Sequence, residues 1–202
     1  MNYYCIKCNK EITLAERDFS MKKYSKPLCR THQTNNSNNG LSQKESRYKE
    51  GMIKGRIAET LIEELFLSLE FNVFRYGMEN TVPGIMDLLK GVRSDVASNI
   101  RRMPDFVIQH PQRKDVFFIE VKFRASEEFK KRDLPADYPY KNCYFIIVSK
   151  KHIKCITYEE LSQGKEVTPT SQNYLGKRKE FELDKDVIIN FCDFAVKFFS
   201  EV

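Results

Sequence analysis

The chain has 202 residues, of which 41% are hydrophobic and 31% charged, and 34 Lys and Arg stand against 28 Asp and Glu. This length suits one main domain with a small appendage. The mean hydropathy of -0.53 and the lack of any apolar run near about 18 residues argue against a membrane-spanning helix. The net charge of +6 permits a nucleic-acid partner without demonstrating one.

The N-terminal residues carry neither the basic nor the apolar block of a signal peptide. We therefore expect a cytoplasmic protein with no membrane partner. In that compartment its six cysteines would be thiols or metal ligands rather than disulfides.

Changes in composition divide the chain into three parts. Residues 1–32 hold three of the six cysteines and one of the three histidines. The polar stretch from Gln33 to Gly40 has nothing to bury and favours turns, so residues 33–48 are expected to form a flexible linker. From residue 49 to residue 202 the pattern is that of one packed domain.

Within residues 49–202, apolar periodicity predicts helices and strands in a fixed order. An apolar residue every four positions predicts an amphipathic helix over 52–69, and the closing segment 187–202 has a similar pattern. Between them the sequence predicts strands at 71–76, 105–109, 116–123, 143–148 and 153–157, with a short helix from Ser126. The run 143–148 is apolar throughout, as expected of a strand covered on both faces. The order predicts an α/β domain with an α-β-β-β-α-β core and a mixed sheet.

Four potential metal ligands lie in the first part of the chain. Cys5 and Cys8 form one pair and Cys29 and His32 another, each with two intervening residues, so that one turn can supply two ligands. Three thiolates and an imidazole suit a closed, structural Zn²⁺ site. A segment so poor in apolar residues rarely folds without a metal. We call residues 1–32 the finger; the alternative is that its thiols are free.

The finger is also basic. Its positive surface suits contact with phosphates and, equally, a solvated face or a surface that docks a protein. The basic residues are Lys7, Lys10, Arg17, Lys22, Lys23, Lys26 and Arg30.

A lysine and two acidic residues stand out on the second and third predicted strands. Strand alternation places Glu120 and Lys122 on one face, and Asp105 opens the partner strand, from which its carboxylate can approach Glu120. Two converging carboxylates repel unless a cation lies between them, and Mg²⁺ accepts about two protein carboxylates. Lys122 could orient or deprotonate an attacking water, or neutralise charge on a phosphate. The alternative is a solvated hairpin face that carries an ion pair.

These residues also resemble the motif of a known family. Pro104-Asp105, fourteen intervening residues and Glu120-Val121-Lys122, after a helix that holds Gly55–Glu59, resemble the PD-(D/E)xK nuclease superfamily. Over about residues 50–157 the element order is similar to the restriction-endonuclease-like core of that superfamily, and the archaeal Holliday-junction resolvases and related restriction-type enzymes look nearest. The resemblance implies that Asp105, Glu120 and, on the first helix, Glu59 bind Mg²⁺ or Mn²⁺ at the active site. It implies that Lys122 is the catalytic lysine.

The expected function is that of a Mg²⁺-dependent endonuclease that hydrolyses phosphodiester bonds in branched or duplex DNA, in recombination, repair or restriction. The rival interpretations are a non-catalytic nucleic-acid-binding zinc-finger protein and an adaptor that docks another protein. Arg93, Arg101 and Arg102 precede Asp105 and suit contact with the DNA backbone and, equally, ordinary surface positions. The closing helix is apolar on more than one side, so it either caps the sheet or forms a homodimer contact. His110 and His152 lie in predicted turns and are expected at the surface.

Overall fold

The computed structural model describes residues 2–37, 43–78, 82 and 84–200 of the chain. The chain forms two compact units, Met1–Gly51 and Met52–Val202. In the described part of the chain, no helix is both long and apolar enough to cross a membrane.

The first unit is a small fold around two buried cysteines. Strands β1 (Tyr3–Tyr4) and β2 (Glu11–Ile12) pair antiparallel, and helices α1 (Leu14–Tyr24) and α2 (Arg30–Ser37) follow. A capping box begins α1 at Thr13, where the side chain and the backbone N–H exchange hydrogen bonds with Glu16. The buried core of this unit consists of Cys5, Ile12, Leu28 and Cys29.

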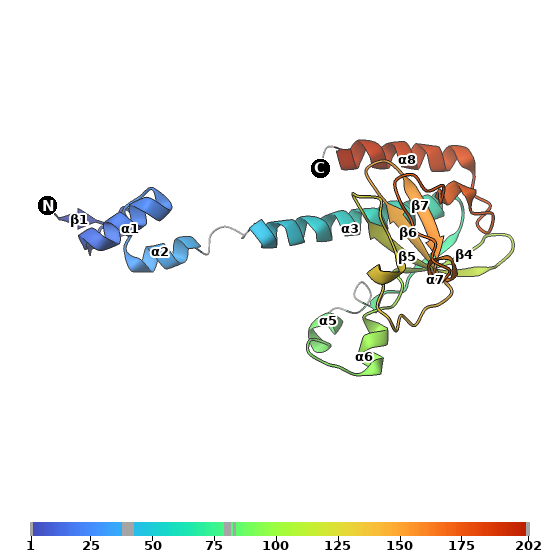
Figure 1. The fold of residues 1–202 in the computed structure, drawn as a ribbon, viewed down its shortest axis with the longest axis horizontal. Coiled ribbons are helices and arrows are strands. Elements are labelled where there is room, and N and C mark those ends of the chain that lie inside the picture. Colours follow the sequence, from blue (N-terminus) through green and yellow to red (C-terminus); the bar gives the residue numbers. More distant parts are fainter. Residues whose placement is uncertain (1, 38–42, 79–81, 83, 201–202) are drawn as a thin grey trace. The chain divides into compact units, whose positions relative to one another are not determined.

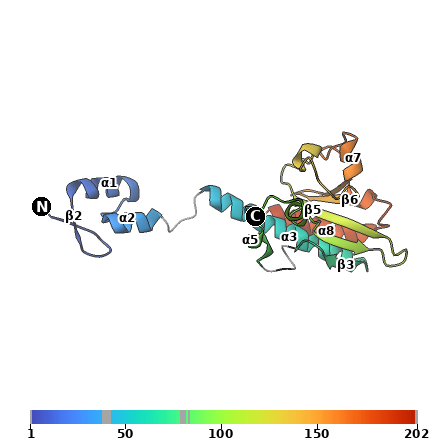
Figure 2. The same ribbon diagram turned by 90° about the horizontal axis from the view of Figure 1, so that it is seen from below.

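The second unit is built on a five-stranded mixed sheet in the order β3-β4-β5-β6-β7 (Figures 1 and 2). Its strands β5 and β6 run parallel, and the other neighbouring strands run antiparallel. The predicted α/β class with a mixed sheet is confirmed, and the last three strands have the predicted bounds. The strands are β3 (Asn72–Arg75), β4 (Phe106–Gln109), β5 (Val116–Phe123), β6 (Cys143–Val148) and β7 (Ile153–Thr157).

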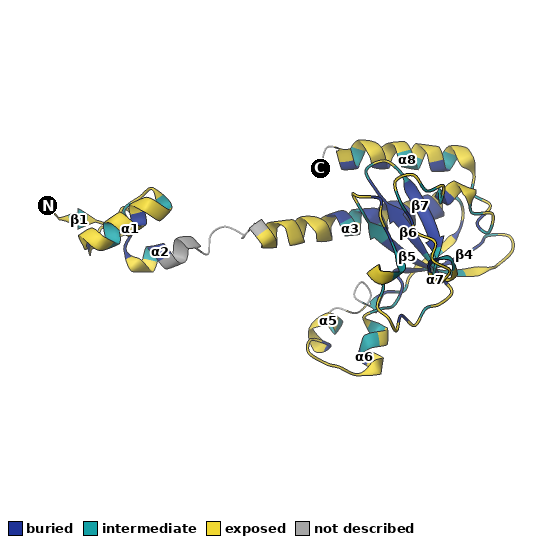
Figure 3. Ribbon diagram, in the orientation of Figure 1, coloured by how far each residue is buried: buried dark blue, intermediate teal, exposed yellow. Residues whose placement is uncertain are grey.

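Two helices cover one face of this sheet. They are α8 (Lys185–Ser200) and the later turns of α3 (Gln43–Ser68). The core beneath them includes Leu65 and Phe66 from α3, Phe199 from α8 and Ile119 from β5. Burial of these side chains fixes the two helices on the sheet (Figure 3).

The opposite face of the sheet is covered by the connection between β5 and β6, by α7 (Tyr158–Ser162) and by the segment around Val167. Strand β6 contributes to both layers, since Ile146 packs under α3 and α8 whereas Phe145 and Ile147 pack in this second core. The prediction that 143–148 is covered on both faces is therefore confirmed. Further short helices in the described part of the chain include α5 (Ile85–Leu88), α6 (Asp95–Ile100) and the 3₁₀ turn η2 (Leu175–Lys177).

Helix α3 begins earlier than the apolar periodicity predicts. It starts at Gln43 rather than near residue 52, and residues 44–51 are all exposed. Exposed polar turns carry no apolar stripe, so their helical state left no periodic signal. Helices α2 and α3 thus extend into residues 33–37 and 43–48 of the expected linker, and residues 38–42 lie outside the described residues.

The short helix expected from Ser126 does not form, and the α-β-β-β-α-β order is wrong at this element. Residues 124–142 connect β5 to β6 with the 3₁₀ turn η1 (Lys131–Asp133) as their helical element. Glu127 adopts a left-handed backbone conformation with a φ of 58° and turns its carboxylate inward to Lys154. Phe129 forms a β-bridge with Val167. A buried ion pair and a bridge outweigh the weak N-terminal helix preference of this sequence.

Candidate functional site

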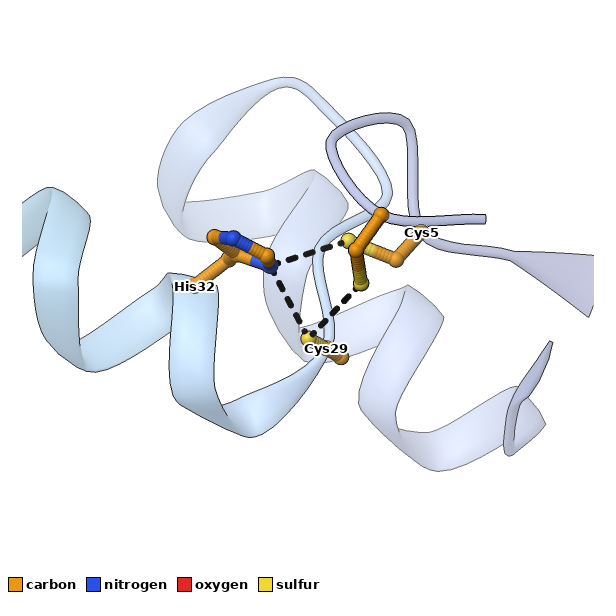
Figure 4. A group of neighbouring side chains, drawn as sticks. Cys5, Cys29 and His32 are labelled. Atoms are coloured by element: carbon orange, nitrogen blue, oxygen red, sulfur yellow. Dashed lines mark hydrogen bonds between the residues drawn. The ribbon is translucent and has the colours of Figure 1, made fainter. Parts of the chain in front are cut away.

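The four metal ligands predicted in the finger lie close together. Cys5 lies in a tight turn after β1, where the Asn9 N–H donates to the Cys5 carbonyl oxygen at 2.9 Å. Cys29 directly precedes α2 and His32 lies in its first turn, so the helix start sets their spacing. The ligand atoms of these two residues, Cys5 and Cys8 all lie within 4.8 Å of one another. Figure 4 shows the side chains of Cys5, Cys29 and His32 converging.

The distances within this cluster suit a tetrahedral ion. Cys8 Sγ is 3.8 Å from Cys29 Sγ, and His32 Nδ1 is 3.6 Å from Cys5 Sγ and 3.2 Å from Cys29 Sγ. A zinc tetrahedron with Zn–S bonds of about 2.3 Å and Zn–N bonds of about 2.0 Å has edges of roughly 3.8 Å and 3.5 Å. The cluster can therefore hold a metal such as zinc, with Nδ1 as the imidazole atom turned toward it.

The backbone of the finger favours a thiolate at Cys5. Burial opposes ionisation of this thiol, but hydrogen bonds from the backbone N–H groups of Cys29, Lys7 and Cys8 lower its pKa to about 6. A thiolate is the form that ligates metal. These N–H groups thus stabilise the Cys5 thiolate without being metal ligands themselves.

In the second unit, Asp105 is anchored at the start of strand β4. Its side chain is buried, and its Oδ2 accepts a hydrogen bond of 2.7 Å from the Val121 N–H of β5. Its carbonyl oxygen accepts from the Tyr76 N–H at 2.9 Å. Since Phe106 pairs with Ile119, one further step of this register sets Asp105 opposite Glu120. Residues opposite each other in antiparallel strands present their side chains on the same face.

Glu120 carries a buried oxygen without a partner. Its Oε1 accepts from Lys122 Nζ, whereas its Oε2 has no hydrogen-bond partner among the described residues. Burial above all, together with the charges of Asp105 and Glu59, raises the pKa of Glu120 to about 7 against the lowering effect of Lys122. An unpaired buried carboxylate oxygen costs folding free energy. A cation or a hydrogen-bond donor that binds this oxygen therefore removes that cost.

Lys122 shares a sheet face with Glu120, as predicted by alternation. Its side chain is about one third exposed and its Nζ pairs with Glu120. Burial favours the neutral amine, but Glu120 and then Asp105 outweigh it and raise the pKa of Lys122. Lys122 is therefore a cation near neutral pH.

Glu59 lies on a helix and not on the sheet that carries Asp105, Glu120 and Lys122. It lies on α3, which packs on the sheet face opposite to Glu120, and it is half-buried. Among the described residues, the finger cluster is the one group of three or more Cys, His, Asp or Glu ligand atoms within 4.8 Å of one another. The carboxylates of Glu59, Asp105 and Glu120 are not drawn together that closely. Glu59 nevertheless contributes charge to the site, since it raises the pKa of Glu120.

Tyr138 is a site neighbour that the sequence indicated only as part of an aromatic turn before β6, not as part of the site. Its ring packs on Phe145, which pairs with Glu120 in the parallel register of β5 and β6, at a centroid distance of 5.6 Å. Its hydroxyl is buried and has no hydrogen-bond partner in the described part of the chain. Burial raises the pKa of Tyr138, so the hydroxyl is a donor. No periodic signal could reveal this, because Tyr138 lies in an irregular connection.

Two of the three arginines that precede Asp105 have structural partners. Arg101 donates to the carbonyl oxygens of Leu89 and Val92 at 3.0 and 2.9 Å. Arg102 forms an ion pair with Asp137 at 2.7 Å, which ties the segment before β4 to the connection that holds Tyr138. Arg93 is exposed.

No family model matches this sequence, and no curated protein or solved structure matches it either. The resemblance to PD-(D/E)xK nucleases therefore rests on the motif residues alone.

Proposed function

We propose that the second unit is a metal-dependent endonuclease of the restriction-endonuclease-like type, with DNA as substrate. The observation that carries the proposal is the buried, unpartnered Oε2 of Glu120 beside an anchored Asp105 and a charged Lys122. Glu-x-Lys with an acidic residue on the neighbouring strand is the residue set of the PD-(D/E)xK motif. Glu59 is proposed as an additional carboxylate, acting through its charge on Glu120.

The donor set fits a hard divalent cation. Asp105 and Glu120 offer carboxylate oxygens, which Mg²⁺ prefers, and one of these oxygens has no other partner. When bound, Mg²⁺ or Mn²⁺ supplies a Lewis acid that polarises a phosphate and makes bound water more acidic. The Val121 N–H holds the Asp105 carboxylate in position for such a cation.

The role proposed for Lys122 is electrostatic. Because its pKa is raised, its ammonium stays protonated near neutral pH and does not serve as a general base. An ammonium at this position donates to a phosphate oxygen and neutralises the charge that builds up during hydrolysis. It also pairs with Glu120, so substrate phosphate and Glu120 share one cation.

The test is cleavage of labelled linear, flapped and four-way-junction DNA by the full chain with Mg²⁺ or Mn²⁺. We expect Glu120→Gln, Asp105→Asn and Lys122→Met each to reduce cleavage by about 100-fold or more while DNA binding persists. The matched control is Glu128→Gln, because Glu128-Phe129-Lys130 repeats the Glu-x-Lys spacing and Glu128 is exposed. Cleavage that survives in Glu120→Gln would contradict the proposal.

A non-catalytic nucleic-acid-binding protein is the second candidate. The observation that favours it is that Glu59, Asp105 and Glu120 are not gathered within 4.8 Å. It predicts DNA binding that weakens steeply with salt, without cleavage by the wild type under any of these conditions. For the finger, we propose a structural Zn²⁺ bound by Cys5, Cys8, Cys29 and His32.

A further inference from the structure

An apolar groove lies between α3 and α8 of the second unit. It has a volume of about 700 Å³ and is lined by Ile53, Ile57 and Leu61 of α3 and by aromatic residues of α8. Phe194 at its edge is 57% exposed. Exposed apolar surface that is gathered in one place often marks an interaction site.

The exposed stripe of α3 runs along this groove, since Arg56, Thr60 and Glu64 also line it, and its residues are placed symmetrically about Thr60. Taking Thr60 as its centre, Arg56 and Glu64 lie four residues to either side, and Ile53 and Leu67 lie seven residues to either side. Ile53 and Leu67 are 57% and 47% exposed. Arg56, Thr60 and Glu64 are exposed as well, and neither charge has an ion-pair partner among the described residues. These spacings keep all five residues close to one face of the helix.

We propose that this face binds a second copy of the same chain through a two-fold axis at Thr60. In an antiparallel pairing of two α3 helices about that axis, Arg56 faces Glu64 of the partner and Ile53 faces Leu67 of the partner. Each contact then occurs twice, as an isologous interface requires. Each charged side chain then contacts one of opposite charge, and each apolar side chain contacts another apolar side chain.

The shape of the stripe fits this pairing. From Ile53 to Leu67 it extends about 21 Å at 1.5 Å per residue, which is long enough for several turns of helix packing. Thr60 is small, so two helix axes can approach closely where they cross. Phe194 and Phe198 of α8 line the groove beside α3 and add apolar area on each side of the helix pair. The inference does not depend on nuclease activity.

Sedimentation equilibrium of the full chain over a range of concentrations tests the interface. We expect a dimer for the wild type. Arg56→Glu and Glu64→Arg each place like charges across both copies of the contact, so the dimer dissociation constant should rise by about tenfold. The double variant with both exchanges should return to the wild-type value, because the pairing is restored with the signs reversed.

Two further samples sharpen the test. Equimolar mixing of Arg56→Glu with Glu64→Arg should give heterodimers tighter than either homodimer, since each partner then supplies the charge that the other lacks. Asp193→Arg, an exposed charge reversal on α8 outside the groove lining, changes the net charge as Glu64→Arg does and should leave the dimer unchanged. A wild type that is monomeric at every concentration overturns the proposal. So does a dimer that the single variants do not weaken, or one that the double variant and the mixture do not restore.

Discussion

The Glu127 side chain shows how one buried charge organises a connection. Its Oε2 lies 3.1 Å from Lys154 Nζ and 3.0 Å from His152 Nδ1. Lys154 is 1% exposed and donates as well to the carbonyl oxygens of Thr168 and Pro169, at 2.6 and 3.0 Å. The lysine thus holds the connection after β5 and the loop after α7 against β7.

Replacing Glu127 by Gln leaves Lys154 buried without its counter-charge. We expect this variant to lose about 3 kcal/mol of unfolding free energy, because removing one partner of a buried pair leaves the other uncompensated. Glu128→Gln, the exposed neighbour, should change the free energy by less than about 0.5 kcal/mol. Urea unfolding of both variants measures the difference, and equal stability of the two would contradict this role of Glu127.

The same pair predicts a pH dependence. Burial works to raise the pKa of Glu127, but hydrogen bonds from His152 and Lys154 outweigh it and lower the pKa below its ordinary 4.5. A lowered carboxyl pKa contributes stability that is present above 4.5 and is lost as the pH falls through the folded-state value. The stability gap between wild type and Glu127→Gln should therefore shrink on acidification below 4.5. Unfolding at a series of pH values measures it, and a constant gap would contradict the prediction.

At the scale of elements, β6 is the strand on which both cores depend. It lies between β5 and β7 and packs Ile146 into one layer and Phe145 into the other. A strand buried on both faces has no solvent-exposed side chains, so truncation of any of its side chains removes buried contacts.

Ile146→Ala should therefore destabilise the second unit by about 2–5 kcal/mol, through lost burial and the cavity that remains. The comparison is Val116→Ala at the exposed end of β5, where Val116 is 60% exposed and the cost should stay below about 1 kcal/mol. Chemical denaturation measures both. An equal loss of unfolding free energy at the two positions would contradict the prediction that burial and the cavity determine the cost of Ile146→Ala.

The elements that the sequence predicts best are those with a strong period. Strand β5 alternates and β6 is apolar throughout, and both have their predicted bounds. Helices α1 and α2 of the finger were not predicted, because a fold with so small a core leaves hardly any apolar stripe on its helices. The prediction of a helix from Ser126 was wrong because Glu127 pairs with Lys154 and Phe129 with Val167. Both partners are far away in the sequence, so a local pattern cannot indicate these contacts.

The candidate site, like the fold, could be predicted from the sequence only in part. Alternation puts Glu120 and Lys122 on one face, but the hydrogen bond from Val121 to Asp105 and the buried hydroxyl of Tyr138 depend on tertiary packing. His110 was expected at the surface and is 3% exposed. Its Nδ1 accepts from the backbone N–H groups of Gln112 and Arg113, and its ring meets Phe71 edge to face, which a turn-like sequence does not reveal.

At the scale of the whole molecule, the two units depend on different sources of stability. The second unit has two large apolar cores, whereas the first has four buried core residues, two of which are proposed metal ligands. Zinc binding supplies roughly 10–16 kcal/mol of apparent free energy in small zinc-binding folds. The first unit should therefore unfold when zinc is removed, and the second should not.

Hydrogen exchange of the zinc-loaded chain before and after a zinc-selective chelator measures this difference. We expect amides in α1 and α2 to lose protection while those of β4, β5 and β6 keep it. Cys29→Ser should behave like the chelated protein, whereas Cys192→Ser, at a half-buried cysteine on α8, should still bind one zinc. Loss of protection in β5 on chelation would show that the units are not independent.

The pairing of Lys122 with Glu120 gives the carboxylate site a built-in counterion. The divalent cation proposed to bind there would compete with an ammonium that is already present. It would have to be abundant to enter, and it could leave without exposing an unpaired charge. Under the proposed function, one chain would thus combine a zinc ion that is retained as long as the finger is folded with a magnesium ion that exchanges freely with the surrounding solution. The proposed activity would then follow the supply of magnesium, whereas the fold would not.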